Sequence, residues 1–304
     1  MSGSHAAGAI DGKSGLRNVL HEAPAARNIE TWLPALTQSA AAVRRSIAET
    51  LFHTGGGHYG GSFSAVELLV TLYARHLRID RDNLGERLRD QFILSKGHAA
   101  VALYAVLSQR NIADLDLNDY ATFRSPLAGH PDMTELPGVD WSTGSLGQGL
   151  SAGLGMALGL RRTGHRVWVM LGDGECQEGQ VWEAAMLAGI AAPDNLHAVV
   201  DLNRRQEFGW HVPGRAIGPI DPVPDMAGKW RAFGWRVLEC DGHDIEAIDE
   251  ACRMAVQGRG PSVILAATRK GQGSTLAQAD PARYHCTDVS VGEHAAIMAE
   301  LAEG

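Results

Sequence analysis

Residues 166–203, RVWVMLGDGECQEGQVWEAAMLAGIAAPDNLHAVVDLN, contain an apolar strand, a helix and a second apolar strand in that order. The runs RVWVML and LHAVVDL are continuous and apolar, which is typical of strands buried on both faces. The alternation continues in a strand at 235–240, a helix at 245–256 and a strand at 261–268. This order predicts an α/β fold with a doubly wound, mostly parallel sheet and helices on both faces.

Polar residues follow these strands at the points where such sheets bind ligands. The first strand runs into Gly172-Asp173-Gly174, and the second ends at Asn203. Because neighbouring parallel strands end at the same edge, we expect Asp173 and Asn203 to lie close together. With the backbone carbonyl of Arg205, they form the oxygen-rich set that Mg²⁺ prefers beside phosphate oxygens. Gly174 would let a backbone N–H approach a diphosphate at the start of the next helix.

A simpler interpretation of this motif is structural. Gly-Asp-Gly alone is more often a turn, and Asn203 could be a loop cap. The strand that precedes the motif, the partner Asn203 and the carboxylate of Glu178 together favour the metal site over the turn.

Length and charge limit the class of protein. We expect a loose tail at residues 1–30 and a single domain at residues 31–304. The net charge of -8 argues against a partner that is nucleic acid or an anionic membrane. Four cysteines without a C-x-x-C pair indicate neither a zinc site nor a disulfide framework. With no signal peptide and no apolar run of about 18 residues, the expected location is the cytoplasm.

The glycine-rich stretch HTGGGHYGGS (residues 53–62) matches G-x-G-x-x-G at Gly55, Gly57 and Gly60. A dinucleotide site needs a strand before these glycines. Here a helix beginning near Ser39 precedes them, and a second helix at 64–77, with Ser64 as its N-cap, follows. We therefore interpret the glycines as allowing a close backbone approach that presents His58 to a channel.

The other expected elements are a strand at 91–95, helices at 98–110, 150–164 and 292–302, and a loop at 125–149.

Six further motifs, in this order, give the chain a resemblance to the transketolase family of thiamine diphosphate enzymes. They are LSKGHA (94–99), GHPD (129–132), STGSLGQGLS (142–151), GDGECQEG (172–179), DGHD (241–244) and KGQGS (270–274). The resemblance runs from about Ala40 to His285 and implies the thiamine diphosphate-binding fold, with the diphosphate-binding (PP) domain of that family.

The resemblance also implies cofactor contacts. Thiamine diphosphate and Mg²⁺ would be held by Asp173, Asn203 and the carbonyl of Arg205. The other cofactor-binding residues would be His98, Gly144, Leu146, Gly172, Gly174 and His285. Glu178 resembles the family's buried acidic residue that links the sites of two subunits, although a carboxylate at a helix start is also favourable through the macrodipole.

Four histidines at family positions, His58, His98, His130 and His285, would line the substrate channel. Imidazole donates or accepts protons near neutral pH, as recognition of a ketose and cleavage of its C–C bond require. His130 would lie near the donor's C1 hydroxyl, and His58 and His285 nearer the C3 hydroxyl and the acceptor.

Three residues depart from the family pattern. Tyr59 stands where a small residue or proline is common, and Glu207 lies where an apolar residue approaches the cofactor. Cys286 follows His285 in YHC, where W-H-G is usual. We expect these changes to affect the substrate more than the cofactor, with Tyr59 narrowing the channel mouth.

The family's pyrimidine-binding and C-terminal domains have no counterpart in the sequence. The resemblance therefore implies an N-terminal subunit that works with a separate C-terminal subunit, most simply as an α2β2 assembly. Two alternatives stay open: the α subunit of a 2-oxo acid dehydrogenase or specialised two-carbon transferase, and a non-catalytic scaffold or regulatory homologue.

Overall fold

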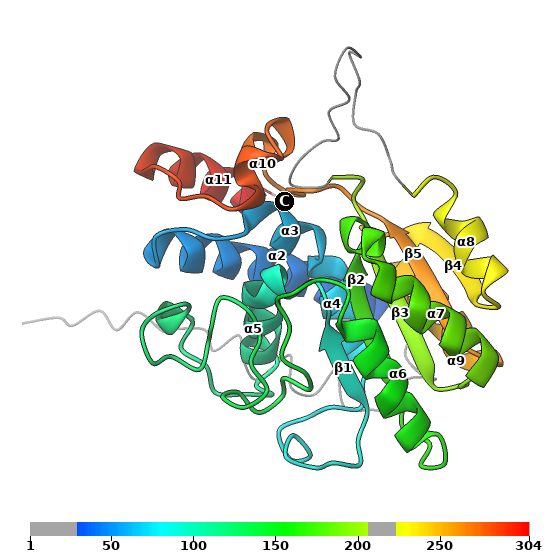
Figure 1. The fold of residues 1–304 in the computed structure, drawn as a ribbon. Helices are drawn as coiled ribbons and strands as arrows, with labels where there is room; N and C mark the ends of the chain where they lie inside the picture. Colours follow the sequence, from blue (N-terminus) through cyan, green and yellow to red (C-terminus); the bar gives the residue numbers. More distant parts are fainter. Residues whose placement is uncertain (1–28, 206–222, 304) are drawn as a thin grey trace, which may run out of the picture.

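The computed structural model describes residues 29–205 and 223–303, and its centre is a five-stranded sheet (Figure 1). The strands are β1 (Gln91–Leu94), β2 (Val167–Gly172), β3 (Leu196–Leu202), β4 (Arg236–Asp241) and β5 (Ser262–Ala267). They pair in the order β1-β2-β3-β5-β4, and every pair is parallel. The expected α/β class is confirmed, and β3 has the bounds that its apolar run predicts.

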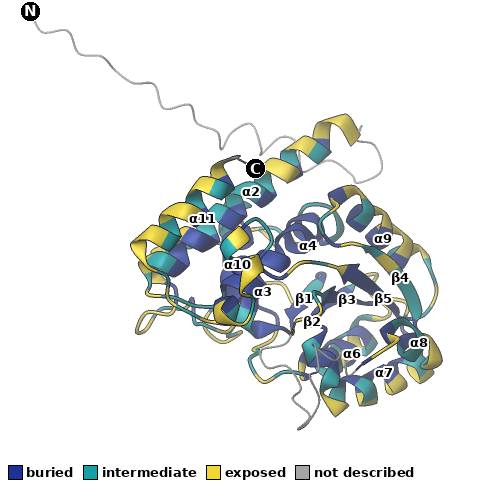
Figure 2. Cartoon of the chain, turned by 90° about the horizontal axis from the view of Figure 1, so that it is seen from above, coloured by how far each residue is buried: buried dark blue, intermediate teal, exposed yellow. Residues whose placement is uncertain are grey.

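Along each strand, alternate residues pack in two different hydrophobic cores, one on each face of the sheet. Val167, Val169 and Leu171 of β2 pack in the core that faces the helices α6 (Gly149–Leu160), α7 (Gly179–Ala191) and α8 (Met226–Ala232). Trp168 and Met170 pack in the core on the opposite face. Helices on that side are α2 (Ile29–His53), α3 (Tyr59–Ser64), α4 (Val66–Thr71), α5 (Ala100–Gln109), α9 (Ile245–Gln257) and α11 (Val291–Glu303). Figure 2 shows α4 and α9 on one side of the sheet and α6 and α7 on the other.

Short helical segments complete the described chain. They are the π-helical turn η1 (Leu72–His76), the 3-10 turns η2 (Gly97–Ala99), η3 (Leu117–Asp119), η4 (Gly174–Gln177) and η5 (Arg283–His285), and the helix α10 (Thr275–Ala279). No helix of the described residues is both long and apolar enough to cross a membrane.

Two expectations about helices are wrong. The first helix begins at Ile29 and not near Ser39, because buried Trp32 and Leu36 continue its apolar face past Pro34. The second helix is divided, and Ser64 ends α3 instead of capping a new helix. Its hydroxyl is buried and lies 2.7 Å from Oδ2 of Asp201, a contact between distant segments that local sequence does not indicate. The extent of the tail and of the single domain stays a prediction.

The three consecutive glycines before α3 make the close approach that their pattern predicts. Gly55, Gly56 and Gly57 all have positive φ, which favours residues without a side chain. A Cβ on Gly56 would lie 2.7 Å from the carbonyl oxygen of Thr287. The backbones of Gly57 and Thr287 exchange two hydrogen bonds of 2.9 and 3.0 Å, which join the loop to the segment after η5.

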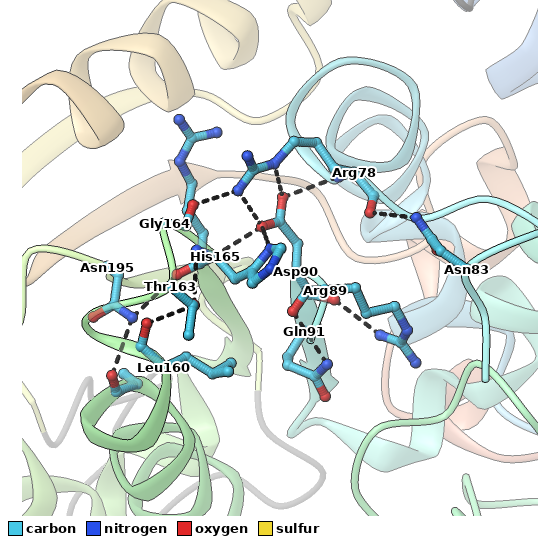
Figure 3. Close-up of polar contacts among 12 residues, drawn as sticks. Arg78, Asn83, Arg89, Asp90, Gln91, Leu160, Thr163, Gly164, His165 and Asn195 are labelled. Atoms are coloured by element: carbon cyan, nitrogen blue, oxygen red, sulfur yellow. Dashed lines mark hydrogen bonds and ion pairs between the residues drawn. The ribbon is translucent and has the colours of Figure 1, made fainter. Parts of the chain in front are cut away.

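A buried carboxylate organises the amino-terminal edge of the sheet, remote from the motifs (Figure 3). Asp90 precedes β1 and is fully buried. It accepts hydrogen bonds from the backbone N–H and guanidinium of Arg78 and from the N–H of Arg166, at 2.7 to 3.0 Å. Burial would raise the pKa of Asp90, but these hydrogen bonds outweigh it and lower the pKa. Asp90 thus aligns the starts of β1 and β2.

Candidate active site

Most of the motif residues lie just beyond the carboxyl ends of the strands. Lys96 and His98 follow β1, Asp173 follows β2, and Asn203 follows β3. This edge is where open parallel sheets bind ligands. The structure therefore brings together segments that are far apart in the sequence.

The four histidines of the expected channel form one cluster around His58. The ring centroid of His58 lies 5.5 Å from that of His98, 6.1 Å from that of His130 and 5.4 Å from that of His285. The rings of His98 and His285 are 5.6 Å apart. They come from four segments: the loop before α3, η2, the loop after α5, and η5. Four imidazoles in one place provide several hydrogen-bond donors and acceptors for a hydroxyl-rich ligand.

Two buried lysines flank this cluster. Lys96 is 1% exposed, and its ammonium donates to the carbonyl oxygen of Gly61 at 2.8 Å and to Oδ2 of Asp201. Lys270 is 5% exposed, and its ammonium lies 2.9 Å from Nδ1 of His285. A buried charge needs a partner, and Asp201 balances Lys96.

These surroundings keep two of the histidines neutral. Burial lowers the pKa of His98 well below its usual value, and the charges of Lys96 and neighbouring groups add to the effect. Burial and the ammonium groups of Lys270 and Lys96 lower the pKa of His285 to about 4. At neutral pH both rings are uncharged, so each has one donor nitrogen and one acceptor nitrogen.

The expected metal ligands also meet at this edge. Asp173 Oδ1 accepts a hydrogen bond from the N–H of Gly174 at 2.8 Å, and Oδ2 accepts one from the N–H of Arg204 at 2.5 Å. Asn203 Oδ1 accepts a hydrogen bond from the N–H of Arg205 at 3.0 Å. The β2–β3 pairing thus places Asp173 against the turn that contains Asn203 and Arg205.

The donor set suits a hard divalent cation. Burial raises the pKa of Asp173 to about 7, and the Asp201 carboxylate adds to the rise. A cation at the carboxylate would offset this cost of burying a negative charge. No three His, Cys, Asp or Glu side chains gather as a metal-binding group in the described residues. The expected set has only one such side chain, with an amide and a backbone carbonyl, as is common for Mg²⁺ that also binds phosphate oxygens.

The loop at 142–149 is joined to the end of β1 by a side chain and lies against His130. Thr143 Oγ1 donates to the carbonyl oxygen of Leu94 at 2.8 Å, and a Cβ on Gly144 would lie 3.5 Å from the ring of His130. Leu146 is half-buried beside Gly147. Gly144 therefore lies next to His130, and Leu146 follows it on the same loop.

Glu175 holds that loop and the end of β2 together. It is 2% exposed, and Oε1 accepts a hydrogen bond from the N–H of Gly147 at 2.8 Å. Its Oε2 accepts one from the N–H of Gly172 at 3.1 Å, and the hydroxyl of Ser95 also donates to the carboxylate. Glu175 therefore connects β1, β2 and the 142–149 loop.

The other predicted residues have different surroundings. Glu178 precedes α7 and is exposed in this single chain, with no side-chain hydrogen bond that caps the helix. Cys286 is exposed. Glu207 lies outside the described residues.

The expectation that Tyr59 narrows the channel mouth is wrong. Tyr59 is fully buried, and its ring packs in the core, 6.0 Å from that of Phe63 and 6.3 Å from that of Tyr284 between centroids. As the first residue of α3, it points into the core while His58 joins the histidine cluster. Tyr284, the residue before His285, is also buried in the core. The two tyrosines thus meet in the core, and the two neighbouring histidines meet in the site.

Sequence reasoning missed Lys96, Lys270 and Glu175. A signal was present, because the chain has only four lysines and two of them stand inside the motifs LSKGHA and KGQGS. Glu175 stands inside GDGECQEG, three residues before the predicted Glu178.

Comparison with known proteins agrees with this geometry. The family model described as the transketolase, thiamine diphosphate binding domain matches residues 36–298. The chain belongs to the transketolase family. Its match is to the part of a transketolase that binds thiamine diphosphate.

Similar proteins include transketolases made of more than one polypeptide. The chain is 41% identical to the 6-deoxy-6-sulfo-D-fructose transketolase subunit of Clostridium sp. strain MSTE9, covering 82% of this chain and 90% of the relative. It is 36% identical to an apulose-4-phosphate transketolase subunit of Phocaeicola vulgatus, covering 76% of this chain and 81% of the relative.

Solved transketolase structures share the fold. The enzyme of Campylobacter jejuni superposes with a TM-score of 0.78 at 27% identity, over 91% of this chain and 43% of that transketolase. The enzyme of Leishmania mexicana also gives 0.78, at 26% identity, over 88% of this chain and 41% of that transketolase. The chain thus spans less than half the length of these solved transketolases.

Proposed function

We propose that this chain is the thiamine diphosphate-binding N-terminal subunit of a two-subunit transketolase. It would transfer a two-carbon ketol unit from a ketose or ketose phosphate to an aldose or aldose phosphate. The observation that carries the proposal is the cluster of four histidines, at the same carboxyl edge of the sheet as Asp173. The names of the subunit-type relatives support it.

Residues at the same edge of the sheet would bind the cofactor. Asp173, Asn203 and the carbonyl of Arg205 would hold Mg²⁺ against the diphosphate, and Gly172 and Gly174 leave room beside it. When bound, thiamine diphosphate supplies the carbanion stabilisation that cleavage and formation of the C–C bond require. Gly144 and Leu146 would contact its aminopyrimidine ring from the fixed 142–149 loop.

The histidines would act on the sugar and the cofactor. His98 would contact the diphosphate as a neutral ring, while His58, His130 and His285 bind sugar hydroxyls and move protons at their oxygens. Lys96, paired with Asp201, and Lys270 help to keep His98 and His285 neutral.

A separate C-terminal subunit would complete the site. Met186, Leu187 and Ile190 on α7 are 44%, 54% and 83% exposed, which is unusual for large apolar side chains and suits a covered surface. Exposed Glu178 begins the same helix, where we propose that it links two sites in an α2β2 assembly. Four free cysteines are consistent with the proposed cytoplasmic location.

Product analysis tests this function. The chain is mixed with the C-terminal transketolase subunit encoded in the same genome, thiamine diphosphate, Mg²⁺ and ribose 5-phosphate. Xylulose 5-phosphate, 6-deoxy-6-sulfo-D-fructose and a 2-oxo acid are supplied as donors in separate reactions. We expect an aldose two carbons shorter than the ketose donor, and no product when either of the two polypeptides is omitted.

Two results would contradict the proposal. Turnover of the 2-oxo acid alone would indicate a dehydrogenase-type subunit. Absence of turnover with every donor, in a complex shown to bind the cofactor, would favour a non-catalytic homologue.

A further inference from the structure

Lys270 is packed so that its ammonium meets one particular nitrogen of His285. It follows β5, and Nζ lies 2.9 Å from His285 Nδ1. Glycine at position 60 leaves the space that the Lys270 side chain occupies. A Cβ on Gly60 would lie 2.9 Å from Lys270 Cγ and 3.1 Å from the carbonyl oxygen of Tyr284. The N–H of Gly271 donates to the carbonyl oxygen of Gly60 at 3.1 Å, which fixes the backbone next to Lys270.

The chemistry of the two groups decides where the ring proton lies. An ammonium has three donors and no acceptor, so Nδ1 of His285 must accept the hydrogen bond. In a neutral imidazole the proton is then on Nε2. A doubly protonated ring would place an N–H against the ammonium, with a second ammonium, that of Lys96, also nearby.

We propose that Lys270 is a positioning residue that fixes His285 in the neutral, Nε2-protonated tautomer, so that His285 serves the reaction as a hydrogen-bond donor. The role in the reaction rests on the proposed function, but the tautomer rests on the contact alone. Lys270 acts through His285, which faces the rings of His58 and His98. A donor at this position would stabilise a developing negative charge on a sugar oxygen, whereas the opposite tautomer would present an acceptor there.

Nitrogen NMR of the full chain tests the tautomer without any need for activity. Histidine rings are labelled with nitrogen-15, and the His285 signals are assigned by their loss in His285→Gln. We expect the wild type to show an unprotonated Nδ1 and a protonated Nε2 from pH 5.5 to 8. Lys270→Met keeps the length of the side chain without the donor, and should show a mixture of tautomers and protonation of the ring at higher pH.

Two variants control for non-specific effects. Lys270→Arg keeps a donor and should keep the Nε2 tautomer. Lys229→Met changes a lysine of α8, away from the cluster, and should leave the His285 signals unchanged. A wild-type ring protonated at Nδ1, or an unchanged Nε2 tautomer in Lys270→Met, would overturn the inference.

Kinetics of the two-subunit complex then test the consequence. In Lys270→Met we expect kcat to fall by about 10-fold or more at pH 8, where part of the neutral rings present an acceptor at Nε2, with partial rescue in Lys270→Arg. The loss should be smaller at pH 6, because a ring protonated on both nitrogens still donates from Nε2. An equal loss in both variants at every pH would show that Lys270 only supports the structure. If the complex lacks transketolase activity, the proposed function fails while the NMR result still decides the tautomer.

Discussion

Burial of one side chain, His197, makes the stability of the fold depend on pH. It is 1% exposed on β3, with its ring 4.7 Å from that of Trp168 and Nδ1 2.8 Å from the hydroxyl of Ser262. Burial lowers its pKa to about 3, and the charges of Arg166 and Arg236 add to the effect, against a smaller opposing effect of Asp90. The unfolded chain therefore binds a proton here at a pH where the folded chain does not.

This difference predicts a loss of stability in acid. A folded pKa of about 3 lies below the ordinary value of about 6.5, so stability falls as the pH drops below 6.5 and continues to fall until pH 3. Relative to His197→Phe, which keeps the ring but cannot titrate, the wild type should lose about 2 kcal/mol more between pH 7 and pH 5. Urea unfolding at the two pH values measures this. An equal loss of unfolding free energy in the wild type and in His197→Phe would mean that His197 does not cause the loss of stability in acid.

At the same scale, sequence predicted the identity of the clustered histidines but not their charge state. The motifs name His58, His98, His130 and His285, and the structure brings all four together. Neutrality of His98 and His285 depends on burial and on Lys96 and Lys270, which arrive from separate strands. Such three-dimensional contacts leave no periodic pattern in the sequence.

At the scale of elements, α3 and η5 act as one unit. Backbone hydrogen bonds join Gly57 to Thr287, and the rings of Tyr59 and Tyr284 meet in the core. His58 and His285, the neighbours of these tyrosines, have ring centroids 5.4 Å apart. Tyr59, a departure from the family pattern, therefore packs against Tyr284, and the pair supports the two histidines.

Paired substitutions at Tyr59 test this unit. Its hydroxyl is buried and has no hydrogen-bond partner among the described residues, so Tyr59→Phe should leave the free energy of unfolding equal or higher. Tyr59→Ala should cost about 3 to 5 kcal/mol, because it leaves a cavity between α3 and η5. Thermal and urea unfolding of both variants measure the difference. An equal loss in Tyr59→Phe and Tyr59→Ala would argue that the hydroxyl, not the packing, holds the two segments.

The strands and most of the helices were predictable from the sequence, but the segment that contains α3 and α4 was not. Burial on both faces gives β2 and β3 continuous apolar runs, so their positions follow from the sequence. The start of α3 at Tyr59 does not, because α3 runs through Gly60 and Gly61, and glycine disfavours helices. A Cβ on Gly61 would lie 2.9 Å from Nε2 of His98.

At the scale of the whole molecule, the two edges of the sheet have different tasks. At the amino-terminal edge, Asp90 accepts hydrogen bonds from Arg78 and Arg166, which hold the starts of the strands together (Figure 3). At the carboxyl edge, Asp173 and Asn203 directly follow two neighbouring strands, and the histidine cluster lies at the same edge. The contacts of Asp90 that hold the strands together thus lie at the opposite ends of the strands from the proposed binding residues.

We propose above all that thiamine diphosphate and Mg²⁺ bind at Asp173 and Asn203. Calorimetric titration of the cofactor into the two-subunit complex, with and without Mg²⁺, tests it most directly. We expect Mg²⁺-dependent binding that Asp173→Ala weakens by at least about 100-fold, because it removes the one charged ligand. His130→Ala, whose proposed role is toward the sugar, should bind the cofactor normally and slow turnover. Unchanged affinity in Asp173→Ala would contradict the account.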